Sequence, residues 1–385
     1  MLKKVTDLDV IVSHTGARER YAVASALENL GALNYLVTDI YLSPSSPLLS
    51  ISKRRFHSGI PVAKVVTLSL LVIAYNKLRG VISKSHYDNW VSRGKQIASL
   101  TRQTLISKPN KKSLKVIWSY TACGYETFKS CSNSSYLLVL NQIDPAFEYY
   151  RIKGVSDIDN NAFLNRVRQE MQMAQIIVVN SEYCKKALVK HHISPQKIEV
   201  LPLIAPQPHA VKRLMSNARL KVGFVGSLSF MKGYDVFCEV ARSLCDIMDF
   251  TAAGKLEESF KRLSENKVHV DEMGLLDSKE INNFYDNLDI LVFPTRSDGF
   301  GMVQLEAMAH GIPVISSSTC ADVVVENKCG FKGENAIEIK EVLLKYHHDR
   351  KMLKSHSDAA LKRCEVYSAQ NFTNQLKRIL TRHLN

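Results

Sequence analysis

The sequence has no pair of cysteines at C-x-x-C spacing, and its eight cysteines stand singly along the chain. We therefore expect reduced thiols and a fold that needs no disulfides. Two catalytic motifs are also missing, the G-x-x-x-x-G-K-[ST] phosphate loop and the G-x-S-x-G nucleophile elbow. Their absence argues against a P-loop NTPase and an α/β-hydrolase.

Long apolar runs are scarce as well. Near the N-terminus the apolar run covers only residues 10–12, which is too short for a secretory signal, so we expect a cytoplasmic protein. A second run, residues 65–75, falls short of the ~20 residues that cross a bilayer. It favours a buried helix of the first domain, and an interfacial segment with its lysines on lipid phosphates is the alternative.

Acidic residues are almost absent from residues 51–115, which contain fourteen Lys and Arg residues but only one acidic residue, Asp88. This block carries most of the formal net charge of +14. Such a one-signed segment is typical of a face for an anionic partner, which here would be an anionic membrane surface or a lipid-phosphate substrate; nucleic acid is the less favoured partner. A merely solvated basic surface remains an alternative.

The remainder of the chain is a regular alternation of short β-branched runs and longer amphipathic stretches. This pattern predicts an α/β protein with two Rossmann-like, parallel-sheet domains, which suits 385 residues. The proline-rich stretch after residue 201 predicts a linker. We place the first domain at 1–205, the linker at 206–218 and the second domain at 219–366. A helix over 367–385 can cross back to the first domain. Strands are expected at 9–13, 35–38, 114–119, 136–140, 176–180, 198–201, 220–225, 249–253, 267–270, 289–294 and 313–316.

The most informative segment is 290–315, ILVFPTRSDGFGMVQLEAMAHGIPVI. A buried strand leads through a glycine-rich turn into a helix near Gly301, whose free backbone amides favour an anion. Two acids, Asp298 and Glu306, flank this helix start. Carboxylates accept hydrogen bonds from sugar hydroxyls, so the combination suggests a ligand with both phosphate and hydroxyl groups, such as a nucleotide sugar.

This segment resembles the retaining glycosyltransferases of family 4, which have the GT-B fold. Their hallmark is two acids eight positions apart in Glu-Gly-Phe-Gly…Glu-Ala-Met-Ala-x-Gly-x-Pro-Val. The match comprises Asp298, Gly299, Phe300, Gly301, Glu306, Ala307, Met308, Ala309, Gly311, Pro313 and Val314. The resemblance implies that Asp298 touches the donor sugar and that Glu306 binds the ribose. The helix start from Gly301 through Met302 to Val303 would stabilise the departing diphosphate through its free amides. Asp298 departs from the family's Glu by one methylene.

A second segment, 222–241, resembles the family stretch that grips the donor diphosphate. Gly226 would let the backbone approach the phosphates, and Lys232 would neutralise the leaving group. The family commonly has Arg where this chain has Ser227. The candidates for a substitute cation are Arg18, Arg20 and Arg296.

The first domain offers weaker signals. Gly16, in the loop after the first strand, occupies the position of a family glycine near the donor phosphates. Asn141, Gln142 and Asp144 stand where many members have a histidine, and they are acceptor-side candidates. Ser181 is expected only to cap a helix. The D-x-D at Asp157 and Asp159 and the His191-His192 and His347-His348 pairs lack the context of metal sites.

The sequence thus predicts a metal-independent, hexosyl-type retaining glycosyltransferase without a cofactor. Asp298 and Lys232 would be catalytic, and Gly16, Gly226, Ser227, Lys232, Gly299, Phe300, Gly301, Met302, Val303 and Glu306 would bind a UDP-, GDP- or ADP-linked sugar. The acceptor would be a glycan or lipid-linked molecule of cell-surface polysaccharide or glycolipid synthesis, at the inner face of the membrane. A GT-B phosphorylase and an inactive anionic-lipid or nucleic-acid binding module are the alternatives.

Overall fold

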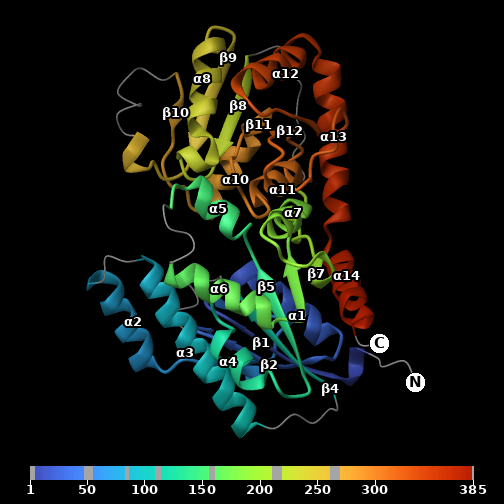
Figure 1. Ribbon diagram of the computed structural model, residues 1–385. Helices are drawn as coiled ribbons and strands as arrows, with labels where there is room; N and C mark the ends of the chain where they lie inside the picture. Colours follow the sequence, from blue (N-terminus) through green and yellow to red (C-terminus); the bar gives the residue numbers. More distant parts are fainter. Residues whose placement is uncertain are drawn as a thin grey trace.

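The computed structural model describes residues 5–46, 55–82, 86–108, 114–155, 161–209, 219–260 and 269–383. It contains two lobes, each built around one parallel sheet with helices on both faces, as the sequence predicts (Figure 1). Asp157, Asp159 and most of the expected linker, 210–218, lie outside the described residues.

The N-terminal lobe has a seven-stranded parallel sheet in the order β3-β2-β1-β4-β5-β6-β7. From β1 the strand order continues in one direction to β2 and β3, and from the neighbouring β4 it continues in the other direction to β5, β6 and β7. The carboxyl ends of β1 and β4 therefore lie at a topological switch point, where ligands of open α/β sheets bind. The strands are β1 (Leu8–His14), β2 (Leu33–Thr38), β3 (Val65–Thr67), β4 (Leu114–Tyr120), β5 (Tyr136–Gln142), β6 (Ile176–Val179) and β7 (Ile198–Val200).

The preferred expectation of a buried helix over residues 65–75 is wrong. Its first residues form the edge strand β3, and the remainder begins α2 (Leu70–Ile82), which packs on α3 (His86–Ser107) at the rim of the lobe. Leu70 and Leu71 are 84% and 83% exposed. The β-branched residues Val65, Val66 and Thr67 pair with β2 as an edge strand. The chain then leaves the sheet, and Leu70 and Leu71 lie outside the core. No helix in the described part of the chain is long and apolar enough to span a bilayer.

The C-terminal lobe has a six-stranded parallel sheet in the order β10-β9-β8-β11-β12-β13. A strand was expected at 267–270, but the strand described in this region is β10, which begins at residue 271, directly after the expected range; residues 267–268 lie outside the described residues. The short edge strand β13 was not anticipated. The strands are β8 (Leu220–Val225), β9 (Met248–Ala253), β10 (Asp271–Glu272), β11 (Ile290–Phe293), β12 (Val314–Ser316) and β13 (Gly330–Lys332).

Helices cover both faces of each sheet. Those of the N-terminal lobe are α1 (Ala22–Asn29), α2, α3, α4 (Tyr125–Cys131), α5 (Phe147–Ile152), α6 (Ala162–Met173) and α7 (Glu182–Lys190). Those that follow the linker are α8 (Tyr234–Leu244), α10 (Ser278–Asp286), α11 (Met302–Ala309), α12 (Ala336–His348), α13 (Arg350–Val366) and α14 (Ala369–Arg382).

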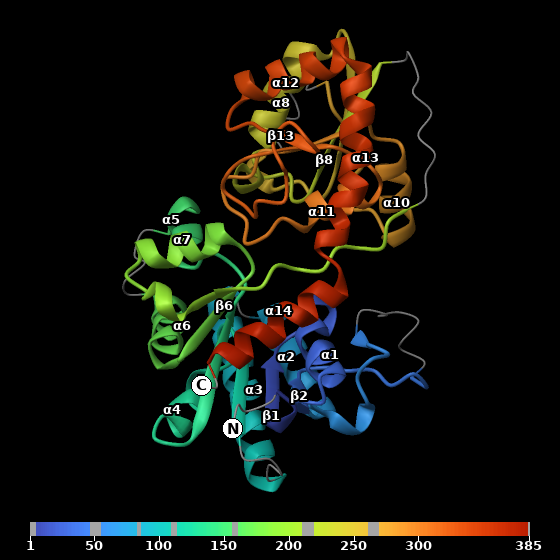
Figure 2. The ribbon, with the colours of Figure 1, turned by 90° about the vertical axis from the view of Figure 1, so that its right-hand side faces the viewer.

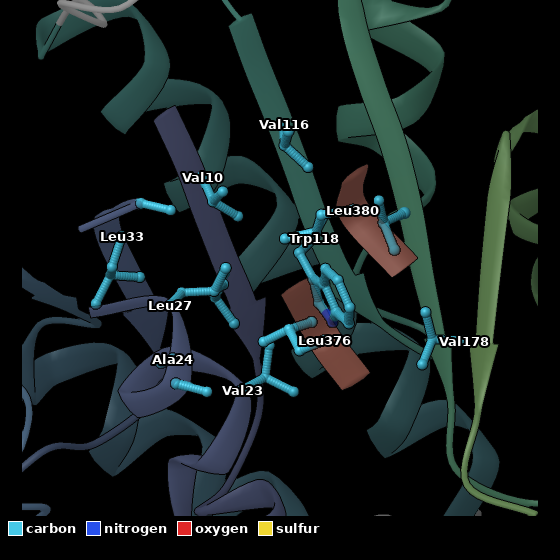
Figure 3. Close-up of a cluster of buried hydrophobic side chains, with 14 of the residues drawn as sticks. Val10, Val23, Ala24, Leu27, Leu33, Val116, Trp118, Val178, Leu376 and Leu380 are labelled. Carbon is cyan, nitrogen blue, oxygen red and sulfur yellow. The ribbon is translucent and has the colours of Figure 1, made fainter. Parts of the chain in front are cut away.

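The last helix returns to the first lobe. Figure 2 shows α13 descending along the C-terminal lobe and α14 lying across the N-terminal one. The apolar face of α14, including Leu376 and Leu380, is buried in the core around Trp118 of β4 (Figure 3). Burying a leucine contributes about 1.5–3 kcal/mol, so α14 ties the two lobes together through the N-terminal core.

Candidate functional site

Two loops at the carboxyl edge of the second sheet are packed against each other. The 3-10 turn Phe230–Lys232 follows β8 and ends at Gly233, where φ is +73° and a Cβ atom would lie 1.9 Å from the carbonyl oxygen of Pro294. The Arg296 amide donates to the Met231 carbonyl at 2.9 Å. This close approach, which only glycine permits, brings Lys232 beside the loop that carries Asp298.

Lys232 and Asp298 form an ion pair between the Nζ and Oδ2 atoms, with both side chains about three-quarters buried. The other oxygen, Oδ1, accepts from the amides of Phe300 at 3.0 Å and Gly301 at 2.8 Å. Asp298 therefore occupies part of the expected anion cradle itself. Within the described residues, the amides of Met302 and Val303, at the start of α11, have no acceptor.

Glu306 lies one turn further along α11, and its side chain is held by a hydrogen bond from α10. Its Oε2 accepts from the Tyr285 hydroxyl at 3.0 Å. Burial, together with this neighbouring carboxylate, raises the pKa of Tyr285 well above its usual range, so the phenol remains a hydrogen-bond donor at neutral pH. Tyr285 fixes one oxygen of Glu306, and the other has no described protein partner.

Gly226 and Ser227 follow β8 directly. A Cβ atom on Gly226 would meet nothing within 4 Å, so the space above this backbone is open. Gly254 packs against this turn, because a Cβ atom there would lie 1.6 Å from the Gly226 carbonyl oxygen, and the Gly226 amide donates to the Ala253 carbonyl at 3.0 Å. Ser227 is half-buried and supplies no positive charge here.

The three candidate cations for the missing arginine differ in their surroundings. Arg296 donates two hydrogen bonds of 2.7 Å to Asp235, and its guanidinium stacks on Phe230 at 3.6 Å, so it is already engaged. Arg20 is exposed. Arg18 lies in the N-terminal lobe, where it lines a cavity.

The lobes touch at Gly299, a contact that the sequence did not reveal. The Gly299 carbonyl accepts from Ser181 Oγ at 2.6 Å and from Cys184 Sγ at 3.3 Å, while a Cβ atom at Gly299 would lie 2.1 Å from the Ile143 carbonyl oxygen. Ser181 also caps α7, as predicted, by accepting from the Cys184 amide. Figure 1 shows α7 directly below α11. The predicted glycine thus lies at a point where the backbones of the two lobes approach closely.

Gly16 lies at the carboxyl end of β1, with φ at +75° and its amide bonded to Asp39 at 2.9 Å. It is grouped with Arg18 around the N-terminal cavity rather than in contact with Lys232 or Asp298. Arg55 pairs with the same Asp39 at 2.7 Å. Among the predicted site residues, those of the C-terminal lobe are therefore assembled on two adjoining loops and one helix, and Gly16 belongs to the opposite lobe.

Two partly buried acids lie on the N-terminal edge of the site. Burial raises the pKa of Asp144, a predicted acceptor-side residue, and hydrogen bonds from the Ala146 amide and Gln142 offset part of this effect. Both Arg18 and Asp298 lie near enough to act electrostatically on Asp144. Asn141 is buried in the core, where its Oδ1 accepts a hydrogen bond from the Trp118 indole at 3.2 Å.

Glu19 is the second partly buried acid, and sequence reasoning missed it. Its Oε2 accepts from the Tyr120 hydroxyl at 2.8 Å, and burial raises its pKa. Glu19, Arg20 and Tyr21 all have positive φ values, a strained backbone that tends to occur at functional sites. The signal available in the sequence was the charged SHTGARER loop, but nothing there distinguished Glu19 from its neighbours.

A group of possible metal ligands lies elsewhere. His209, Asp286 and His310 have ligand atoms within 4.8 Å of one another, with the two imidazole rings stacked at 4.5 Å. Stacked rings do not share a plane, and a metal ion must lie close to the plane of each imidazole that binds it. This arrangement, which also involves Asp286 bonded to His310 Nδ1 at 2.7 Å, acts instead as a contact of the interdomain segment with the C-terminal lobe.

The fold and the family agree on the class of protein. The two-lobed arrangement is the GT-B fold, and residues 219–349 match the family model described as Glycosyl transferases group 1. The C-terminal lobe thus matches this glycosyltransferase family in sequence.

Curated relatives match over part of their length. An uncharacterised 41.2 kDa protein in the cps region of Klebsiella pneumoniae is 27% identical over 184 residues, which are 43% of this chain and 50% of that protein. The D-inositol 3-phosphate glycosyltransferase of Mycolicibacterium gilvum is 28% identical over 171 residues, 39% of this chain and 38% of that one. The chain therefore spans half or less of these relatives.

Solved structures match over nearly the whole chain at low identity. Sucrose-phosphate synthase from Thermosynechococcus elongatus gives a TM-score of 0.71 at 13% identity and covers 98% of this chain and 99% of its own. HepE of Anabaena in complex with UDP gives 0.66 at 12% identity, covering 97% and 99%. These likenesses establish the fold.

Proposed function

We propose that this protein is a glycosyltransferase that moves a sugar from a nucleoside-diphosphate donor to a glycan or lipid-linked acceptor. The observation that carries the proposal is the Lys232–Asp298 pair beside the two unpartnered amides of Met302 and Val303, at the edge where the two lobes meet. A cation and free amides suit a diphosphate, and a carboxylate suits sugar hydroxyls.

Each residue of the site has a distinct task in this proposal. Lys232 and the α11 amides hold the diphosphate and stabilise the charge that develops as it leaves. Glu306, fixed by Tyr285 through one oxygen, offers its other oxygen to ribose hydroxyls. Gly226 and Ser227 provide open backbone beside the phosphates, while Gly299, Phe300 and Gly301 shape the loop. The UDP complex of HepE supports a nucleotide in this fold.

The proposed chemistry proceeds with retention at the anomeric carbon. Asp298 is anchored through Oδ1 and paired through Oδ2, so on donor binding it would exchange Lys232 for the transferred sugar as Lys232 moves to the phosphates. Since Lys232 and the amides supply the positive charge, we propose that transfer needs no divalent metal. The contact at Gly299 would exclude water from the donor.

The acceptor side is the less defined half of the proposal. A relative encoded in a cps region supports a role in cell-surface polysaccharide synthesis, and another is named for a phosphorylated inositol acceptor. The partly buried Glu19 and Asp144 lie at the edge that would receive the acceptor, and a protonated or hydrogen-bonded carboxyl there would orient its attacking hydroxyl.

A thermal-shift panel with UDP, GDP and ADP tests the donor half. One nucleotide at about 100 times its Kd should stabilise the protein by about 2.7 kcal/mol, because it binds only the folded state. The Glu306→Gln variant should lose most of this shift, because an amide replaces the free carboxylate oxygen. Glu280→Gln, an acid that caps α10 in the same lobe, serves as the control and should keep the shift. Stabilisation by none of the nucleotides would refute the proposal.

We further propose that the N-terminal lobe docks on an anionic membrane surface. On α2, Leu70, Leu71, Tyr75 and Leu78 are exposed within the basic stretch 51–115. Exposed apolar side chains beside excess positive charge are typical of interfacial helices.

Vesicle co-sedimentation tests this docking. The protein should bind phosphatidylglycerol-containing vesicles and not pure phosphatidylcholine. A Leu70→Ser, Leu71→Ser variant should bind at least tenfold more weakly, because removing two leucines from an apolar interface costs about 2 kcal/mol or more. Ile106→Ser, at an equally exposed isoleucine on α3, is the control and should bind normally. Equal binding by all three proteins would contradict the role of α2.

A further inference from the structure

A cavity of about 290 Å³ opens at the carboxyl edge of the N-terminal sheet. Five segments of the chain meet there: the loop after β1, the end of β2, the stretch around Arg55, α3, and the loop after β4. Its charged lining residues are Arg18, Arg55, Arg93 and Asp39, and the loops contribute backbone from Thr15–Ala17 and Thr121–Cys123.

The charge of this cavity is unbalanced. Among the lining residues that the structure describes, Asp39 is the only acid, and its carboxylate is already paired with Arg55 and bonded to the Gly16 and Ile40 amides. In the parts of the chain that the structure describes, neither Arg18 nor Arg93 has a carboxylate at ion-pair distance. Two guanidiniums thus line one small space and have no ion-pair partner in the described part of the chain, although Arg18 also acts electrostatically on Glu19 and Asp144. An anion bound between Arg18 and Arg93 would neutralise charge that no lining carboxylate balances.

The walls of the cavity are held by buried contacts. Glu170, fully buried on α6, accepts from the amides of Ala122, Gly124 and Tyr125 at 2.7–2.9 Å and so fixes the loop after β4. On the other side Gly94 of α3 approaches Ala122 so closely that a Cβ atom there would lie 1.9 Å from its carbonyl oxygen. The position of Arg93, next to Gly94, is therefore set by the same packing.

The cavity also lacks a titrating cation. Burial lowers the pKa of His14, the last residue of β1, to about 4, so its imidazole is neutral at physiological pH. All of the positive charge among the lining residues then comes from arginines, which suit planar or tetrahedral oxyanions because each offers a fork of donors.

We propose that this cavity is the subsite for an anionic group of the acceptor, a phosphate or a carboxylate held by Arg18 and Arg93 with Arg55 behind Asp39. The assignment to the acceptor rests on the proposed transfer function. Arg18 and Asp298 both act on Asp144, which places the cavity on the same edge as the donor loops but in the other lobe. An acceptor anchored here would direct a hydroxyl toward Asp298.

Trp90 provides a direct readout, because it lines the cavity and the chain has only one other tryptophan, the fully buried Trp118. We expect glucose 6-phosphate or glucuronate to change the Trp90 fluorescence in a saturable way, whereas glucose should not. Comparing the two anions distinguishes a phosphate from a carboxylate subsite. A Trp90→Phe variant should lose the signal, which assigns it to this cavity.

Substitution of one arginine tests the charge directly. Arg93→Gln should weaken binding of the responding anion roughly ten- to hundredfold, the range for a lost charged hydrogen bond. Arg102→Gln, an exposed arginine on the same helix and outside the cavity, removes the same net charge and should change the affinity little. An equal loss in both variants would show general electrostatic attraction and overturn the proposal, as would no response to either anion.

Competition separates this subsite from the donor site. Saturating UDP, or the nucleotide selected in the thermal-shift panel, should leave the anion affinity unchanged, and Lys232→Met should lower nucleotide binding without affecting the anion. If the nucleotide displaces the anion and Arg93→Gln weakens both ligands together, the cavity belongs to the donor diphosphate and the acceptor assignment is wrong. Binding of the anion without binding of any nucleotide would refute the proposed transfer function while supporting the anion subsite itself.

Discussion

Replacing Asp298 with asparagine is expected to abolish most transfer activity while leaving the protein folded. The carboxamide oxygen can still accept from the Phe300 and Gly301 amides, so the start of α11 is preserved. Its NH2 group, however, would face Lys232 Nζ, donor against donor, and the negative charge beside the transferred sugar would be lost. Removing one preorganised electrostatic group of this kind costs about 10²–10³ in kcat.

The measurement is release of the nucleoside diphosphate from the donor that the panel identifies. Asp298→Ala should lose the same activity and in addition about 1 kcal/mol of stability, because the two amides lose their capping acceptor. Asp249→Asn is the matched control, since Asp249 forms an exposed ion pair with Arg219 in the same lobe, at the first residues of β8 and β9. Full activity in Asp298→Asn would remove Asp298 from the mechanism.

The substitution Gly299→Ala is expected to be nearly as damaging, by a different route. A methyl group at Gly299 would lie 2.1 Å from the Ile143 carbonyl oxygen, so the two backbones cannot keep their present contact. The lobes would have to separate by about 1 Å, and a misplacement of that size can cost about 10²-fold in rate. Each lobe has its own core clusters, so the melting temperature should fall little.

Small-angle scattering and nucleotide release together check this expectation. Gly299→Ala should enlarge the radius of gyration and lower activity, with donor binding to the C-terminal lobe largely retained. Tyr183→Phe is the graded control, because it removes only the 3.1 Å hydrogen bond to Ser297 across the same boundary and introduces no clash. Were Gly299→Ala as active as Tyr183→Phe, the observed contact between the lobes would have no part in turnover.

The two lobes differed in how far the sequence could describe them. In the C-terminal lobe, Asp298 and the glycines lie on the loop after β11, and Glu306 lies on α11, which follows that loop. Because these residues are close together in the sequence, the local structure alone brings them near one another. Edge strands were harder to predict, because β10 and β13 have two and three residues and carry almost no periodic signal. The exposure of α2 was misjudged because an apolar run shows hydrophobicity but not which face of it finds a partner.

By itself, the sequence determined the parallel α/β architecture and the residue types on the loops around Asp298, because strand periodicity and a local motif depend on residues close together in the chain. Tertiary structure alone decided that Gly299 meets Ile143, that Lys232 reaches Asp298 and that Arg18, Arg55 and Arg93 surround one cavity. Those contacts join residues from separate crossovers of the sheets, and only the packing of the strands sets which loops share an edge.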